Sequence, residues 1–67
     1  MKVKIVNTSF GEDNDDMARL YSRIIEGPDN MTVPRVGDRV HVGYVPAPIV
    51  RNVTWFVDKK EVLVEIS

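Results

Sequence analysis

Apolar and polar residues alternate along several stretches of this chain, with the period of two that is typical of half-buried β-strands. The alternation begins in residues 2–7, where Val3 and Ile5 share one face of an extended backbone and Lys2 and Lys4 share the other. The sequence therefore predicts a first β-strand over residues 2–7, with Val3 and Ile5 in the core.

The longest predicted strand covers residues 49–57, and its more apolar face is assigned to the core. That face consists of Ile49, Val53, Trp55 and Val57. Since Trp55 shares it, we expect the indole to be buried. On the opposite face, Val50 and Phe56 are candidates for an exposed apolar patch, the kind of surface that marks a protein interface or a dimer contact.

A tight turn is predicted at residues 58–61, followed by a last strand. The turn lacks the Asn-Gly or Asp-Gly pair of a two-residue hairpin loop, which favours a four-residue loop around a type I turn. After it, Val62, Val64 and Ile66 alternate toward the core. Leu63 lies outward between two glutamates, so the polar face of this strand carries one apolar residue.

The middle of the chain enters a further strand through a proline-marked turn. Pro34 keeps the approach extended, and Gly37 supplies the backbone freedom that the turn needs. We expect residues 39–43 to form a strand, with Val40 and Val42 on its inner face together with Val36. Residues 44–48 are bracketed by prolines and predict a stiff extended loop.

Residues 17–26 have two interpretations. As a helix, the apolar residues fall at helical spacing, Asn14 or Asp15 caps the start and Gly27-Pro28 ends the segment. As a strand, Leu20, Ser22 and Ile24 face the core, and the acidic residues before the segment form the tip of a hairpin with the first strand. The strand is preferred because the first strand otherwise lacks a neighbour close in sequence.

These elements predict a mainly β fold in a single domain of residues 1–67: a small five-stranded barrel or a strongly bent antiparallel sheet. The alternative is an α+β fold with a helix at residues 15–26 packed on a four-stranded sheet. From Val36 to Ser67, the order of strand, loop, long strand, tight hairpin and last strand resembles an SH3-like small barrel, and the Gly37-Asp38-Arg39-Val40 opening is similar to the start of such modules. The resemblance implies topology, and binding by loops at one end of the barrel.

Composition narrows the classes of function. The formal net charge is −1, which lacks the positive excess that a general nucleic-acid footprint needs. Cysteine is absent, so neither a disulfide framework nor a cysteine-based zinc site braces the fold. The charged N-terminal stretch predicts no signal peptide and no membrane segment, and we expect a cytoplasmic protein. A chain of 67 residues is near the lower limit for a self-sufficient core, so pairing of two copies fits.

The sequence also argues against catalysis. The acidic run of residues 12–16 has suitable oxygens for calcium, but not the spacing of a calcium loop, so no metal site is predicted. His41 is the only histidine, and the chain has no thiol nucleophile, nucleophile elbow or phosphate-cradling glycine loop. We therefore predict a protein that is not an enzyme and uses no cofactor.

Six residues are the candidates for binding because they combine charge or an aromatic ring with predicted exposure. They are Arg35, Arg39, His41, Tyr44, Arg51 and Phe56. The favoured function is a small protein-binding module, similar to the short accessory or inhibitor proteins of bacteria and their phages that act by occluding a larger partner. The alternative is a small barrel that binds single-stranded nucleic acid or nucleotides through Arg39, Arg51, Tyr44 and Phe56.

Overall fold

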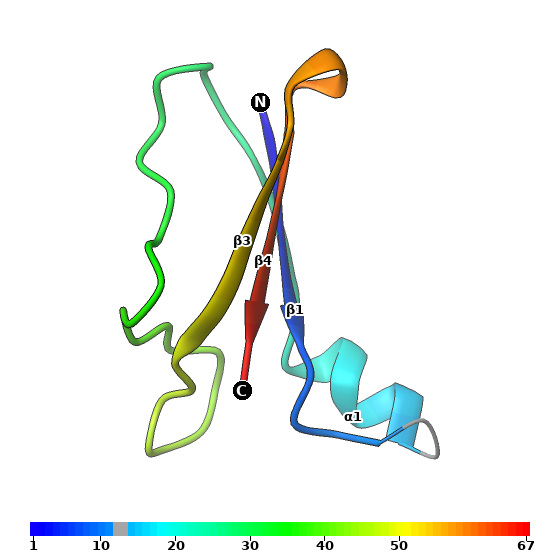
Figure 1. Ribbon diagram of the computed structural model, residues 1–67. Coiled ribbons are helices and arrows are strands. Elements are labelled where there is room, and N and C mark those ends of the chain that lie inside the picture. The colour runs from blue at the N-terminus through cyan, green and yellow to red at the C-terminus, as the bar shows by residue number, and fades with distance from the viewer. Residues whose placement is uncertain (12–13) are drawn as a thin grey trace.

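The computed structural model describes residues 1–11 and 14–67, which form one four-stranded sheet, one short α-helix and one 3-10 turn (Figure 1). The elements in chain order are β1 (Lys2–Asn7), α1 (Asp15–Leu20), β2 (Arg23–Glu26), β3 (Val50–Phe56), the 3-10 turn η2 (Val57–Lys59) and β4 (Glu61–Ile66). The predicted first strand, the final hairpin and the last strand are confirmed. A mainly β fold is confirmed with them.

The sheet is open and mixed, with the strand order β2-β1-β4-β3. β1 and β4 lie side by side in parallel in the middle of the sheet, whereas β2 and β3 form antiparallel edges (Figure 1). The predicted five-stranded barrel is therefore not confirmed, and the parallel pair excludes a purely antiparallel sheet. The parallel pair brings together the first and the last strand of the sheet, and no local sequence pattern predicts this contact.

The segment at residues 17–26 is divided between the two interpretations. Its first part belongs to α1, whose first turn carries Asp15 and Asp16, where acidic side chains favour the positive end of a helix. Its last part forms β2, which does pair with β1 in antiparallel, as expected. The predicted facing is wrong, however: Ile25 pairs with Val3, so Ile24 lies on the other face and is 67% exposed. The alternative helix at 15–26 is wrong in its second half.

The core lies on one face of the sheet, which we call the inner face. The seven buried apolar residues are Val3, Ile5, Val42, Val50, Val62, Val64 and Ile66. The strict alternation of β1 and β4 explains five of them, because every second side chain of a strand points to the same face. On the outer face, Lys4 lies 3.8 Å from Glu61 and Leu63 is half-buried, as expected for an outward residue.

Residues 27–49, which we call the cover segment, close the inner face without forming a regular strand (Figure 1). The strand predicted at residues 39–43 is reduced to one bridge between Arg39 and Ile49. Gly37 and Gly43 both have positive φ, at 96° and 124°, and these angles break the extended run. As a result Val42 is buried, whereas Val36, which was expected on the same inner face, is 65% exposed.

A β-bulge at Arg51 changes the facing of β3. The register passes from the pair Val50–Ile66 to the pair Asn52–Glu65, so one residue of β3 has no partner of its own. Val50 therefore turns inward and is 1% exposed, and the predicted outward patch of Val50 with Phe56 does not form. Trp55 keeps the inner face but is 56% exposed, which corrects the expectation that it is buried.

Candidate functional site

The edge of β3 has unpaired main-chain groups in its C-terminal half, which is the upper half in Figure 1. Ile49 exchanges two main-chain hydrogen bonds with Ser67, the residue after β4, at 3.0 and 3.1 Å. The main-chain groups of the next residue, Val50, point away from β4. The carbonyl of Val50 accepts from the N–H of Gly37 at 3.0 Å, and its N–H donates to the carbonyl of Asp38 at 2.8 Å. The alternation of an antiparallel ladder, continued past the bulge, turns the main-chain groups of Val53 and Trp55 in the same outward direction. No backbone hydrogen bond from elsewhere in the described residues reaches them. We call these groups the open edge.

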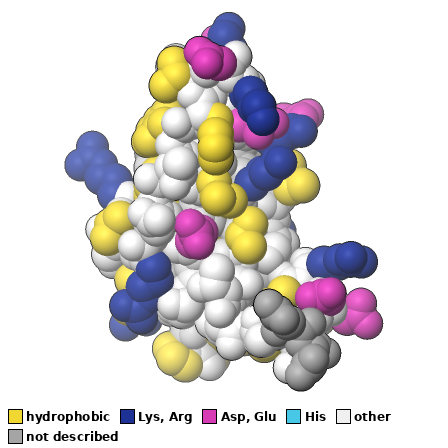
Figure 2. Space-filling view, turned by 45° about the vertical axis from the view of Figure 1, so that its right-hand side comes forward, with side chains coloured by type: hydrophobic (Ala, Val, Ile, Leu, Met, Phe, Trp, Pro, Cys, Tyr) yellow, Lys and Arg dark blue, Asp and Glu magenta, His cyan; other side chains and the backbone are white. Residues whose placement is uncertain are grey.

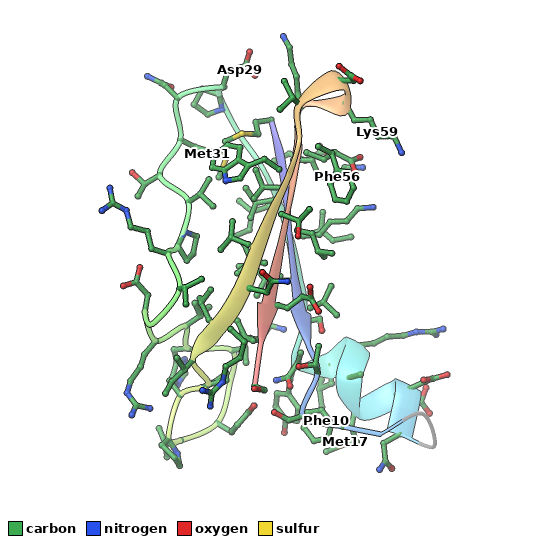
Figure 3. All side chains as sticks on the ribbon, in the orientation of Figure 1. Phe10, Met17, Asp29, Met31, Phe56 and Lys59 are labelled. Atoms are coloured by element: carbon green, nitrogen blue, oxygen red, sulfur yellow. The ribbon has the colours of Figure 1, made fainter. Side chains whose placement is uncertain are left out.

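A groove of about 560 Å³ runs beside the open edge. Its walls are Val53 and Trp55 of β3 and the first part of the cover segment, residues 31–36, which we call the arm. In Figure 1 the arm stands apart from β3, and in Figure 3 Met31 projects from it toward the sheet. Pro34 has no N–H to donate, so the middle of the arm is a poor partner for a β-strand.

The two ends of the groove are fixed by different contacts. At the lower end, Arg35 and Asp38 form a turn in which the N–H of Arg35 donates to Oδ2 of Asp38 at 2.9 Å. At the upper end, near the hairpin tip, the carboxylate of Asp29 accepts hydrogen bonds from Lys60 at 3.2 Å and from the amino group of Met1 at 3.3 Å. The bond from Lys60, together with the amino group of Met1, lowers the pKa of Asp29 below its ordinary 3.8. The cover segment is thus held to the rest of the fold on both sides of the arm, by Asp29 before it and by the bonds of Gly37 and Asp38 to Val50 after it.

Trp55 dominates the surface beside the groove. It is the only tryptophan, and its neighbours Phe56 and Val57 are also exposed, at 42% and 80%. Phe56 lies on the outer face, with Nζ of Lys59 at 6.0 Å from its ring centre (Figure 3). Exposed tryptophan is enriched at the centres of protein interfaces, because it buries a large area at a small entropic cost.

Near the lower end of the groove, three arginines accompany the carboxylate of Asp38, whose Oδ2 is bonded to the main-chain N–H of Arg35. Arg35 lines the groove, and the guanidinium groups of Arg39 and Arg51 bond to neutral oxygens, the carbonyl of Ala47 at 2.9 Å and Oγ of Ser67 at 3.0 Å. None of these three arginines forms an ion pair with another residue in the described part of the chain. Elsewhere the charges are mixed, and the face in Figure 2 shows basic and acidic side chains interspersed with hydrophobic ones.

The six predicted binding residues do not form one cluster. Arg35 lines the groove, Arg39 and His41 are exposed further along the cover segment, and Arg51 is exposed at the bulge. Phe56 is exposed on the outer face, as expected, and so lies on the opposite side of the sheet from the groove.

Tyr44 was a candidate for exposure and is instead half-buried. Its hydroxyl accepts a hydrogen bond from Nδ2 of Asn7 at 2.8 Å, and its ring meets Tyr21 edge-on, with ring centres 4.8 Å apart. Phe10 stacks on Tyr21 at 5.6 Å and completes this aromatic cluster beside α1. The hydroxyl and ring of Tyr44 are therefore engaged within the fold.

The acidic run has only a partial structural description. Glu12 and Asp13 lie outside the described residues, whereas Asn14, Asp15 and Asp16 are exposed at the start of α1. Within residues 1–11 and 14–67, no group of three histidine, aspartate or glutamate side chains is placed to hold a metal ion.

Sequence reasoning missed the open edge, the arm as a wall, and Trp55 as an exposed residue. The one local signal was Pro34, which indicates a segment that does not pair as a strand. The exposure of Trp55 depends on its position in the sheet, which no local pattern gives. Trp55 faces inward, but it lies on an edge strand beside the hairpin tip, where no neighbouring strand of the described chain covers it.

Comparisons with known proteins give no significant match to a family model, a curated protein or a solved structure. The resemblance to SH3-like barrels stays a prediction. Among the described residues, no helix has the length and apolar character needed to cross a membrane.

Proposed function

We propose that this chain is a small, non-enzymatic protein-binding module that takes up an extended segment of a partner protein along the edge of β3. The observation that carries the proposal is the open edge at Val53 and Trp55 beside the groove. Strand addition to an exposed sheet edge is a common way of recognising peptides, in which main-chain bonds supply affinity and pockets for alternate side chains supply specificity.

The exposed ring of Trp55 and the open main-chain groups are the two identifiable sources of binding energy for such a segment. Trp55 is 56% exposed, and covering about 100 Å² of its surface contributes about 2–3 kcal/mol at 25 cal/mol per Å². Each main-chain hydrogen bond adds about 1 kcal/mol net. These two contributions sum to about 6–7 kcal/mol before the cost of association is subtracted, so tight binding also requires contacts of the segment with the arm.

A module of this kind acts by occupying a segment that its partner needs, which suits an accessory or inhibitor protein of bacteria or phages. The arm and Trp55 contribute more to this proposal than the loop at residues 44–48, because Tyr44 is held inside an aromatic cluster. A cytoplasmic setting remains part of the proposal, and pairing of two copies is an outcome that the experiment below detects.

The test is selection of peptides from a displayed random library, followed by binding of labelled peptides to the whole chain. We expect selected peptides to bind and to shift the amide resonances of Val53, Trp55 and the arm. Trp55→Ala should weaken binding at least tenfold. Phe56→Ala is the matched control, because it removes an exposed aromatic ring from the adjacent residue on the opposite face.

Three results would overturn the proposal. They are failure of any peptide to be selected, amide shifts confined to the outer face, and equal losses in the two variants. Single-stranded oligonucleotides in the same assay test the alternative function. Binding that falls steeply with salt and involves Arg39 and Arg51 would favour nucleic acid instead. Sedimentation of the free chain shows whether it pairs with a second copy, and the amide resonances of Val53 and Trp55 then show whether that copy lies on the open edge.

A further inference from the structure

We propose that the segment accepted by this groove runs antiparallel to β3 and carries an apolar residue followed, two positions later, by an acidic residue. The inference rests on the proposed function, and it states the chemistry of the partner at the same site. It follows from three features: the facing of the open edge, the direction of the chain already paired with β3, and the charges at the two ends of the groove.

Facing determines which residues of the partner enter the groove. In an antiparallel ladder, residues directly opposite each other project to the same face of the sheet. Val53 and Trp55 face inward and line the groove, so the two partner residues opposite them also project into it. These residues are two positions apart, and the residue between them points to the outer face. The groove therefore selects the first and third residues of a tripeptide.

The direction follows from the lower half of the same edge. Gly37 and Asp38 already bond to Val50, and Arg39 pairs with Ile49 in antiparallel. A partner strand that runs antiparallel to β3, as residues 37–39 do, lies beside Val53 and Trp55 with its C-terminal end toward Gly37. Antiparallel pairing is also slightly more stable per residue than parallel pairing. The partner residue opposite Trp55 therefore comes first, and the residue opposite Val53 comes two positions later.

Charge then assigns the two positions. Arg35 lines the groove and belongs to the turn at its lower end, on the side of Val53, and its guanidinium has no ion pair among the described residues. An acidic side chain opposite Val53 complements this charge. At the upper end, the ammonium groups of Lys60 and Met1 are already paired with the carboxylate of Asp29, so among the described residues the unpaired cation of the groove is Arg35 at the lower end. An apolar side chain against Trp55 fits that end.

The experiment uses labelled peptides with identical threonine and serine flanks, capped at both ends. The central tripeptides are Leu-Thr-Glu, the reversed Glu-Thr-Leu, and Leu-Thr-Lys. Binding is measured by anisotropy and located by amide shifts on the whole chain. We expect Leu-Thr-Glu to bind at least tenfold more tightly than either of the others, and to shift Val53 and Trp55.

A charge exchange then tests the assigned partner of the acid. Arg35→Glu should reverse the preference, so that Leu-Thr-Lys binds more tightly than Leu-Thr-Glu. Arg39→Glu is the matched control, because it makes the same charge change on an exposed arginine that does not line the groove, and it should retain the preference for Leu-Thr-Glu.

The outcomes separate this inference from the proposed function. Equal binding of the reversed peptide, or an unchanged preference in Arg35→Glu, overturns the inference. In that case, shifts at Val53 and Trp55 still support binding at the open edge. If none of the three peptides, and no library-selected peptide, shifts these two amides at millimolar concentration, the proposed function fails as well.

Discussion

Removing one hydroxyl group, by Tyr44→Phe, should destabilise the fold measurably even though the aromatic ring is retained. Asn7 is 2% exposed at the end of β1, and its Nδ2 donates to the hydroxyl of Tyr44 at 2.8 Å. Oδ1 of Asn7 accepts from the N–H of Ser9 at 2.9 Å, so the side chain is held from both sides. Phenylalanine leaves the amide donor of Asn7 buried without its partner.

The expected loss is about 1–3 kcal/mol in the free energy of unfolding, the cost of leaving a buried polar group unsatisfied. In a chain of this size each kcal/mol corresponds to a fall of about 4–8 °C in Tm. Urea and thermal unfolding followed by far-ultraviolet circular dichroism measure both quantities. Tyr21→Phe is the matched control, since the hydroxyl of Tyr21 makes no hydrogen bond within the described residues and its loss should cost less than about 0.5 kcal/mol.

A double-mutant cycle of Tyr44→Phe with Asn7→Ala isolates the pair. The two changes should be non-additive by about 0.5–2 kcal/mol, because each removes the same bond. Additive effects, or equal stability of Tyr44→Phe and Tyr21→Phe, would refute the view that Tyr44 has a structural role. That result would instead favour the prediction from the sequence that Tyr44 is a binding residue.

Three further predictions concern the sheet, a turn and the pH dependence. Val64→Ala, at a site with 0% exposure, should cost about 2 kcal/mol by urea unfolding, and more than Leu63→Ala on the outer face, although the latter removes the larger group. Gly37→Ala should cost about 1–2 kcal/mol because φ is 96°, whereas Gly11→Ala, with no atom within 4 Å of the added methyl group, should change stability by less than about 0.5 kcal/mol. The carboxyl of Asp29 should titrate below pH 3.8 in a nuclear magnetic resonance experiment, so its contribution to stability is present at neutral pH and is lost as the pH falls through that lowered pKa. Asp29→Asn should remove this part of the acid sensitivity, and an Asp29 pKa at or above 3.8 would contradict the assigned contacts.

Local alternation was enough to predict the strands that carry the core. Val3 and Ile5 of β1 and Val62, Val64 and Ile66 of β4 are all buried, because a period of two places them on one face whatever their neighbours are. The pairing of β1 with β4 was not predictable in the same way. It joins residues about sixty positions apart, and nothing in either strand specifies its partner.

The errors came from single backbone events that redirect many side chains. The bulge at Arg51 turns Val50 inward, and positive φ at Gly37 and Gly43 ends a run of alternating residues that otherwise resembles a strand. In residues 17–26, helical spacing prevails up to Leu20, and pairing with β1 prevails from Arg23. The helical spacing and the strand pairing are both present in this segment, but each interpretation applied one of them to all of residues 17–26.

The two edges of the sheet differ in a way that favours β3 as the binding edge. Open edges invite uncontrolled pairing, which proteins limit with short strands, charges, bulges and covering segments. β2 has four residues, and Arg23 and Glu26 flank its two isoleucines, so it offers little length to a second strand. β3 is longer, but its lower half is bulged at Arg51 and covered by Gly37 and Asp38. What remains open is the span of Val53 and Trp55, which is long enough for one short segment and too short to extend the sheet indefinitely.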